Sequence, residues 1–160
     1  MEELKKFIVF QLNTEHYGVH IQQVLSIEKV THITPVPNTS PFIQGVMNLR
    51  GEITPVIDLK GRLQIGTAEH TASTRILIVH INDTQVGLLV DSATDVIDLE
   101  QSLIDSPPET VGSLSGSYIN GVAKVEEKLL ILLDLEKVLN LEEMSEAKQA
   151  AGSTNTEVER

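Results

Sequence analysis

Short hydrophobic runs separated by turn-forming residues dominate the pattern of this chain. Residues 7–12 are rich in strand-forming side chains, residues 13–16 can turn, and residues 17–21 resume with apolar and polar positions in alternation. Residues 75–81 and 86–90 repeat this pattern around a second turn. Each pair of runs therefore predicts a β-hairpin.

The two hairpins belong to a longer internal repeat. One set of matches is separated by 69 positions and pairs Gly18, Val24 and Ile27 with Gly87, Ala93 and Val96. A second set is separated by 76 positions and pairs Phe42, Gly45 and Asp58 with Tyr118, Gly121 and Asp134. An insertion of seven residues between the two sets accounts for the change in offset. Ordered matches of this kind favour duplication over chance.

Each half of the chain is predicted to form a hairpin, a long arm, a second hairpin and a short helical turn. The second hairpins join residues 45–49 to 53–57 and residues 121–125 to 129–133. Asp58 and Asp134 follow these strands, where a carboxylate can accept hydrogen bonds from the first free amides of a helix. We expect both to be N-caps.

These elements predict an all-β protein made of two small antiparallel barrels. Residues 1–6 form an N-terminal extension, barrel one spans about residues 7–70, and barrel two spans about residues 75–140. Residues 141–160 form a tail that begins helical and ends disordered. The polar segment 64–74 is the expected junction loop, and an exchange of a segment between the barrels there stays open. The core must be aliphatic, because the chain has only five aromatic residues.

The net charge of the chain disfavours negatively charged partners. Among 160 residues, 12 Lys and Arg stand against 23 Asp and Glu, which gives a net charge of −11. An acidic surface repels phosphate backbones and anionic headgroups, so nucleic acid and direct membrane insertion are not expected. The absence of cysteine excludes disulfides and thiolate chemistry. The apolar run near the N-terminus is too short for a signal peptide, so we expect a cytoplasmic protein.

The residue patterns point to no catalytic or metal site. Asp58 and Asp134 lack the Gly-containing loop that an aspartic protease needs, and capping explains them better. His16 and His20 are four residues apart, but their segment is predicted as turn and strand without a surrounding carboxylate motif. Nucleophile-elbow and phosphate-loop patterns are also absent from the sequence. We therefore expect no enzymatic activity, no metal and no cofactor.

Two features have both a structural and a functional interpretation. Arg50 stands at the tip of a hairpin, where it is either a solvated charge, a partner for a nearby Glu, or an anchor for a carboxylate or backbone carbonyl at an interface. Val24 and Ile27 belong to an apolar stretch that follows the first hairpin. The stretch itself has no clear helical or strand periodicity. This stretch either packs in a core or lines a groove between the barrels.

A longer motif connects these features to a known family. Residues 45–59, with the sequence Gly-Val-Met-Asn-Leu-Arg-Gly-Glu-Ile-Thr-Pro-Val-Ile-Asp-Leu, closely resemble the signature of CheW, the adaptor family of bacterial chemotaxis. The flanking residues 17–21, 34–37, 41–45 and 86–91 agree with it. The resemblance covers about residues 7–140, and its combined motifs are highly specific.

The resemblance implies two five-stranded SH3-like barrels and a non-enzymatic adaptor. Members of the family couple the cytoplasmic tips of methyl-accepting chemoreceptors to the regulatory domain of the histidine kinase CheA. They also form rings, in which other CheW copies are further partners. The implied location is the cytoplasm, with recruitment to receptor arrays at the membrane. The adaptor would act by stabilising one arrangement of receptor and kinase, without chemistry of its own.

The resemblance also implies a set of partner-binding residues. By position these are Val24, Ile27, Glu28, Gly45, Arg50, Ala93 and Val96. One departure is Ser26, where some members carry an acid, and Glu28 is the nearby carboxylate that can replace it. Two other classes of function stay open: a small-ligand sensor with its site in the inter-barrel groove, and a hydrolase with an unrecognised site. A sensor requires a polar cluster in the groove, and a hydrolase requires converging titratable groups.

Overall fold

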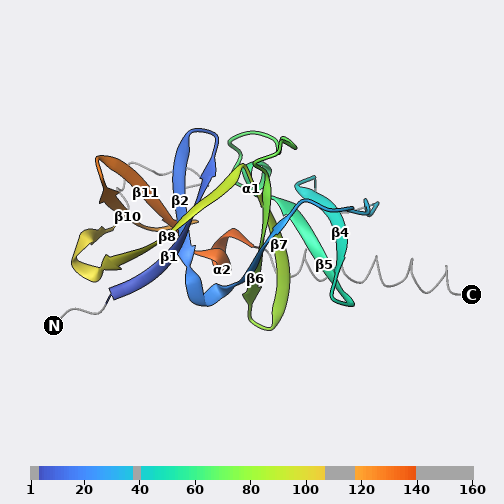
Figure 1. The fold of residues 1–160 in the computed structure, drawn as a ribbon, viewed down its shortest axis with the longest axis horizontal. Coiled ribbons are helices and arrows are strands. Elements are labelled where there is room, and N and C mark those ends of the chain that lie inside the picture. Colours follow the sequence, from blue (N-terminus) through green and yellow to red (C-terminus); the bar gives the residue numbers. More distant parts are fainter. Residues whose placement is uncertain (1–3, 38–40, 107–117, 140–160) are drawn as a thin grey trace, which may run out of the picture.

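The computed structural model describes residues 4–37, 41–106 and 118–139, and strands make up most of this part of the chain (Figure 1). The first half forms β1 (Leu4–Leu12), β2 (Glu15–His20), β3 (Val24–Lys29), β4 (Ile43–Leu49) and β5 (Glu52–Asp58). The second half forms β6 (Arg75–Ile81), β7 (Thr84–Val90), β8 (Ser92–Glu100), β9 (Ile104–Asp105), β10 (Ile119–Val125) and β11 (Lys128–Leu133). The short helices are η1 (Ile21–Gln23), α1 (Leu59–Arg62), η2 (Gln101–Leu103) and α2 (Leu135–Val138). The predicted tail, residues 141–160, lies outside the described residues.

The strands form two sheets that exchange their hairpins. One sheet has the order β8-β1-β2-β11-β10-β9 and the other the order β3-β6-β7-β5-β4. The hairpin β1–β2 therefore pairs with strands of the second half of the chain, and β6–β7 pairs with strands of the first half. Residues 7–70 and 75–140 therefore do not each close into a barrel alone, and the exchange that the sequence left open involves these two hairpins. The physical reason lies in the arms: β3 and β8 leave their own hairpins and pair with the opposite ones.

Each sheet closes into an SH3-like barrel. In the β1 barrel, β8 pairs with β1 at one edge of the sheet. β9 follows β8 after η2 and pairs with β10 at the other edge, so the segment from β8 to β9 closes the barrel. In the β4 barrel, two backbone hydrogen bonds of 2.8 Å between Thr34 and Val46 hold the same place. The predicted five-stranded architecture is thereby confirmed, with β9 as a two-residue sixth strand in one barrel.

The register of the strands reproduces the repeat seen in the sequence. Ala93 lies opposite Phe10, and 69 residues earlier Val24 lies opposite Val79, the counterpart of Phe10. The parallel pairs follow the same rule, because Leu132 faces Gly18 where Val56 faces Gly87. Position by position, the barrels are therefore comparable, and a residue and its repeat counterpart occupy the same place.

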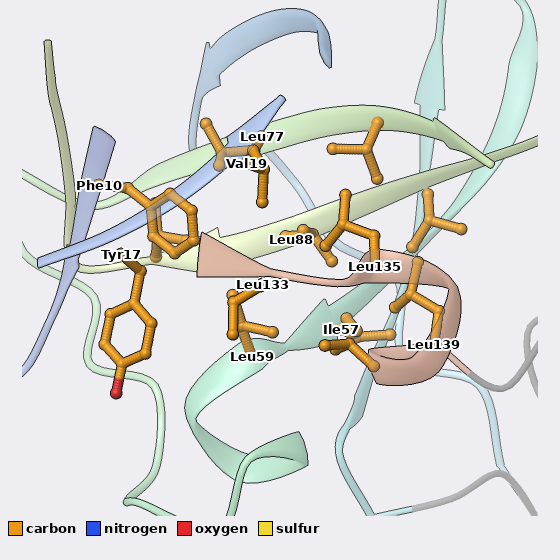
Figure 2. Packing of buried hydrophobic residues seen from close by; sticks show 14 of the residues in the cluster. Phe10, Tyr17, Val19, Ile57, Leu59, Leu77, Leu88, Leu133, Leu135 and Leu139 are labelled. Atoms are coloured by element: carbon orange, nitrogen blue, oxygen red, sulfur yellow. The ribbon is translucent and has the colours of Figure 1, made fainter. Parts of the chain in front are cut away.

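The exchanged hairpins are buried on both faces, which explains their unbroken hydrophobic runs. In β6, Ile76 and Ile78 fill the inside of the β4 barrel, whereas Leu77 and Val79 join a core shared by both barrels. Figure 2 shows this shared core, in which side chains from both hairpins and from α2 pack closely. The barrels therefore form one folding unit, since separating them would expose the shared core to water.

The two predicted N-caps behave differently. The Asp134 carboxylate accepts a hydrogen bond from the Glu136 amide at 3.1 Å and caps α2 as predicted. Asp58 also precedes a helix, but its carboxylate makes no cap bond and accepts instead from the Ala68 amide at 2.8 Å. The prediction for Asp58 was wrong because the segment after α1 folds back and offers a competing donor.

Two basic side chains of α1 contact the second half of the chain. The buried Lys60 ammonium lies 3.0 Å from the Asp91 carboxylate, at the end of β7. Arg62 lies over the rings of Phe42 and Tyr118, which are repeat counterparts, and its Nε donates to the Val138 carbonyl of α2. Both contacts join segments that are far apart in sequence, so they fix α1 against the other half of the chain.

The imidazole of His20, at the start of the arm that leads to β3, makes stability depend on pH. Its ring lies 4.6 Å from that of Phe7, and desolvation, followed by the charge of Lys5, lowers the pKa of His20 below its ordinary value. Protonation therefore favours the unfolded chain. Stability is fully present above the unfolded value of about 6.5 and is lost as pH falls toward the folded pKa.

We expect His20→Gln to reduce the loss of stability that wild type shows as pH falls below about 6.5. Urea unfolding at a series of pH values from about 7.5 to 5 measures this difference. Parallel pH profiles of the two proteins would contradict the assignment of this effect to His20.

Candidate partner-binding site

Val24 and Ala93 occupy equivalent positions at the edge of the shared core. Val24 lies opposite Val79 and Ala93 lies opposite Phe10, and both opposing residues are fully buried. Val24 and Ala93 themselves are half-buried and pack against the shared core. Their predicted place between the barrels agrees with this geometry, although both contribute to the packing as well.

Ile27 and Val96 lie one step further out on the same sheet faces. They are opposite Leu77 and Ile8, which belong to the shared core, yet their own exposed fractions are 43% and 48%. Directly opposite residues of an antiparallel pair share a face of the sheet. Ile27 and Val96 therefore extend the apolar inter-barrel faces into solvent. We call these two side chains the apolar margin.

Arg50 and Glu28 form a second group at one end of the β4 barrel. Arg50 stands in the tight turn between β4 and β5 with φ of 52°, and Gly51 follows with φ of 86°. The guanidinium lies 4.0 Å from the Glu28 carboxylate, and the Arg50 side chain keeps 77% of its surface exposed. An exposed pair of this length contributes at most about 1 kcal/mol to stability. The guanidinium thus keeps most of its donors available to a partner.

Ser26 lies beside this group with a buried hydroxyl that has no hydrogen-bond partner in the structure. Glu28 is two residues further along the same strand, and successive side chains alternate between faces, so both share the face that Arg50 approaches. Glu28 is thus the carboxylate that pairs with Arg50 in the described part of the chain, and its replacement of an acid at Ser26 stays a prediction.

Gly45 has a different role from the one the resemblance implies. It is buried with φ of 148°, and a Cβ atom there would lie 2.2 Å from the Thr34 carbonyl oxygen. Thr34 and Val46 form the hydrogen bonds that close the β4 barrel. Burial leaves Gly45 little surface for a partner, so we reassign it from a contact residue to a structural one.

The structure thus divides the predicted residues between two surfaces. The apolar margin and the half-buried pair behind it lie between the barrels, whereas Arg50 and Glu28 lie at the end of one barrel. Sequence reasoning missed Leu25, which is 54% exposed in the bulge of β3 between Val24 and Ser26. Its signal was present as a third apolar residue in a stretch without periodicity, but a bulge cannot be located from composition.

The alternatives of an enzyme and a small-molecule sensor require specific polar groups. Within residues 4–37, 41–106 and 118–139, no group of three or more His, Asp or Glu is arranged to hold a metal ion. The side chains of the shared core that Figure 2 shows between the barrels are mainly aliphatic, with Phe10 and Tyr17 among them. In the described part of the chain, no helix is long and apolar enough to cross a bilayer.

The fold and these surfaces define a class: proteins of two interleaved SH3-like barrels that present exposed apolar and charged side chains around a shared core. Residues 6–143 match the family model described as the CheW-like domain. The chain belongs to the CheW family, whose members are scaffold and adaptor proteins of chemotaxis.

Individual relatives agree with this assignment over most of their length. The chain is 43% identical over 143 residues to the chemotaxis protein CheW of Bacillus subtilis, covering 89% of this chain and 92% of the relative. It is 35% identical to chemotaxis protein CheW of Klebsiella aerogenes, covering 93% and 90%. The crystal structure of the scaffolding protein TtCheW from Thermoanaerobacter tengcongensis matches with a TM-score of 0.80 and 38% identity, covering 88% and 90%.

Proposed function

We propose that this chain is a non-enzymatic adaptor that couples the cytoplasmic tips of chemoreceptors to the regulatory domain of the histidine kinase CheA. The observation that carries the proposal is the division of the candidate residues between two separate surfaces. One is the apolar margin, and the other is the exposed Arg50 with Glu28. An adaptor must hold two partners at once, and the apolar and the charged residues offer different kinds of contact to them. Scaffold names among the relatives support the same function.

The adaptor acts by thermodynamic coupling. It stabilises one arrangement of receptor and kinase, so that a ligand-driven change at the receptor tip alters the activity of the kinase. Further copies of this chain join such assemblies in rings, and the protein is recruited from the cytoplasm to receptor arrays. The net charge of −11 agrees with docking to receptor tips away from the anionic membrane.

Reconstitution from purified components tests the proposal. The chain is mixed with CheA and a soluble receptor signalling tip, and sedimentation and kinase phosphorylation are both measured. We expect a ternary complex and receptor-dependent stimulation of the kinase only when the chain is present. Binding of neither partner by the folded chain would refute the function, and binding of one partner only would refute the two-surface mechanism.

The apolar margin is expected to contribute directly to binding. Ile27→Thr and Val96→Thr keep the β-branched shape that suits a strand but replace exposed apolar surface with a hydroxyl. We expect partner binding to weaken about tenfold for either variant. Calorimetric titration with each partner measures the loss, and thermal unfolding confirms that the fold is intact. Unchanged affinity for both partners would remove the margin from the site.

Val24→Met tests the residue behind the margin. Because Val24 is half-buried against the shared core, the added volume should weaken binding and cost about 1 kcal/mol of stability. Ala93→Met is the matched variant at the equivalent position of the other barrel. A fall of many degrees in melting temperature, with normal binding by the folded fraction, would make these residues part of the core only.

A further inference from the structure

The β1 barrel has an open cleft at one end. The cleft has a volume of about 250 Å³. Its apolar walls come from the inside of the barrel and consist of Val9, Ile97, Val125 and Leu130. Its rim is polar and charged and consists of His16, Asp95, Glu126 and Lys128, beside Leu129, which is 59% exposed. An apolar pocket with a charged rim is the usual shape of an anchor site for one inserted side chain.

This cleft is the repeat counterpart of the Arg50 end of the β4 barrel. The offset of 76 places Glu126 at the position of Arg50, and the offset of 69 places Asp95 at that of Ser26. Glu126 has φ of 49°, close to the 52° of Arg50, so the two turns also have the same backbone shape. The chain therefore carries the same site twice, in two chemical versions.

The two versions differ in the side chains that line them. Val9 and Val125 of the cleft correspond to Ile78 and Leu49, and each valine has one carbon fewer than its counterpart. The places of His16 and Leu130 are taken in the β4 barrel by Gln85 and Thr54, whose side chains are joined by a hydrogen bond of 2.9 Å. The β1 barrel thus carries the smaller side chains at Val9 and Val125 and the larger, apolar one at Leu130.

The two versions also differ in charge. The Arg50 guanidinium is replaced in the cleft by the Glu126 carboxylate, and the Ser26 hydroxyl by the Asp95 carboxylate. An adjoining cleft adds Glu15 and Glu127 to the acidic side. Lys128 and His16 are the basic side chains among the residues that line the two clefts, so carboxylates outnumber them. The rim therefore favours a positively charged ligand.

We propose that this cleft is a second docking site, which binds a partner segment that inserts one large aliphatic side chain and carries Arg or Lys beside it. The aliphatic side chain fills the space between Val9 and Leu130, and the basic neighbours pair with Asp95 and Glu126. The site goes beyond the adaptor function proposed above and does not depend on it, because neither Arg50 nor the apolar margin takes part.

Peptide titration tests the site in the full-length chain. The probe is acetyl-Gly-Arg-Leu-Arg-Gly-amide, and the comparison peptides replace Leu by Ala or both Arg by Glu. Binding is followed by chemical shifts of the isotopically labelled protein. We expect shifts in Val9, Ile97 and Leu130 with the probe, and at least about tenfold weaker binding of either comparison peptide.

The protein variants install the residues that the other barrel carries at the same places. Glu126→Arg reverses the charge of one rim residue. The equivalent turn of the other barrel already has Arg at positive φ, so the fold should tolerate it, and the affinity for the probe should fall at least about tenfold. Val9→Ile combined with Val125→Leu fills the pocket and should have a similar effect, provided that thermal unfolding shows an intact fold. Arg50→Ala should leave the probe affinity unchanged, which separates this site from the adaptor surfaces.

The proposal is overturned if the probe produces no shifts around the cleft, if the acidic peptide binds equally well, or if Glu126→Arg binds the probe normally. Sedimentation of the unliganded chain covers one other occupant. Concentration-dependent self-association that Glu126→Arg abolishes would assign the cleft to a second copy of this chain and would also overturn the proposal.

Discussion

Gly45→Ala is expected to lower the free energy of unfolding by about 3 kcal/mol or more. The new Cβ atom would lie 2.2 Å from the Thr34 carbonyl oxygen, and that atom is backbone, which cannot move aside as a flexible side chain would. Relief of the clash must break the hydrogen bonds between Thr34 and Val46 that close the β4 barrel. The φ of 148° at this position adds strain for any residue with a side chain.

Gly51→Ala is the matched control for this prediction. Gly51 also has positive φ, at 86°, but a Cβ atom there meets nothing within 4 Å. It should cost only the backbone penalty of about 1 to 2 kcal/mol. Urea unfolding of both variants measures the difference. If Gly45→Ala were as stable as Gly51→Ala but failed to bind partners, the correction of Gly45 to a structural role would be wrong.

The elements and the repeat could be predicted because both are local or periodic properties. Alternation and turn residues identified the hairpins, and fixed offsets identified the duplication. The partition of strands between barrels could not be predicted in this way. Both faces of the hairpin β6–β7 are apolar, so its pattern fits either barrel equally well. Only the long-range pairings of β3 and β8 decide between them.

Single residues show the same limit. Asp58 and Asp134 occupy identical places in the repeat, and a local rule predicted the same cap for both. Asp58 instead accepts a hydrogen bond from the amide of Ala68, ten residues further along the chain. The cap rule holds where no competing donor folds back, which a sequence read locally cannot reveal.

The candidate site was predicted in composition but not in arrangement. The resemblance supplied the positions, and the structure separated them into the apolar margin, the Arg50–Glu28 pair and the buried Gly45. The exposed fraction of each residue, which the sequence does not give, separates these three groups. The cleft in the β1 barrel gave no signal in the sequence by itself, because its lining residues come from strands that only the fold brings together.

Arg50→Ala should lower receptor-dependent stimulation of CheA about thirtyfold or more, while both barrels stay folded. The folded state loses only the exposed ion pair with Glu28, which contributes at most about 1 kcal/mol. A partner loses a planar donor group that can bind a carboxylate or carbonyl through two parallel hydrogen bonds. Arg50→Lys should fail nearly as badly, because Lys lacks the planar fork. Lys keeps the charge and meets the same backbone strain at φ of 52° as Arg, so neither the charge nor the strain changes.

The measurement is kinase phosphorylation with purified receptor tip, CheA and each variant, together with circular dichroism. Lys124→Ala is the matched control, since it removes an exposed cation from β10 of the other barrel, outside both candidate surfaces. It should stimulate the kinase as wild type does. Normal stimulation by Arg50→Lys would reduce Arg50 to a general positive charge, and unfolding of Arg50→Ala would make it a structural residue. A specific hydrogen-bonded contact is required if both Arg50 variants lose activity with an intact fold while Lys124→Ala stays active. Loss of one positive charge cannot explain that result, because Lys124→Ala also loses one and Arg50→Lys loses none.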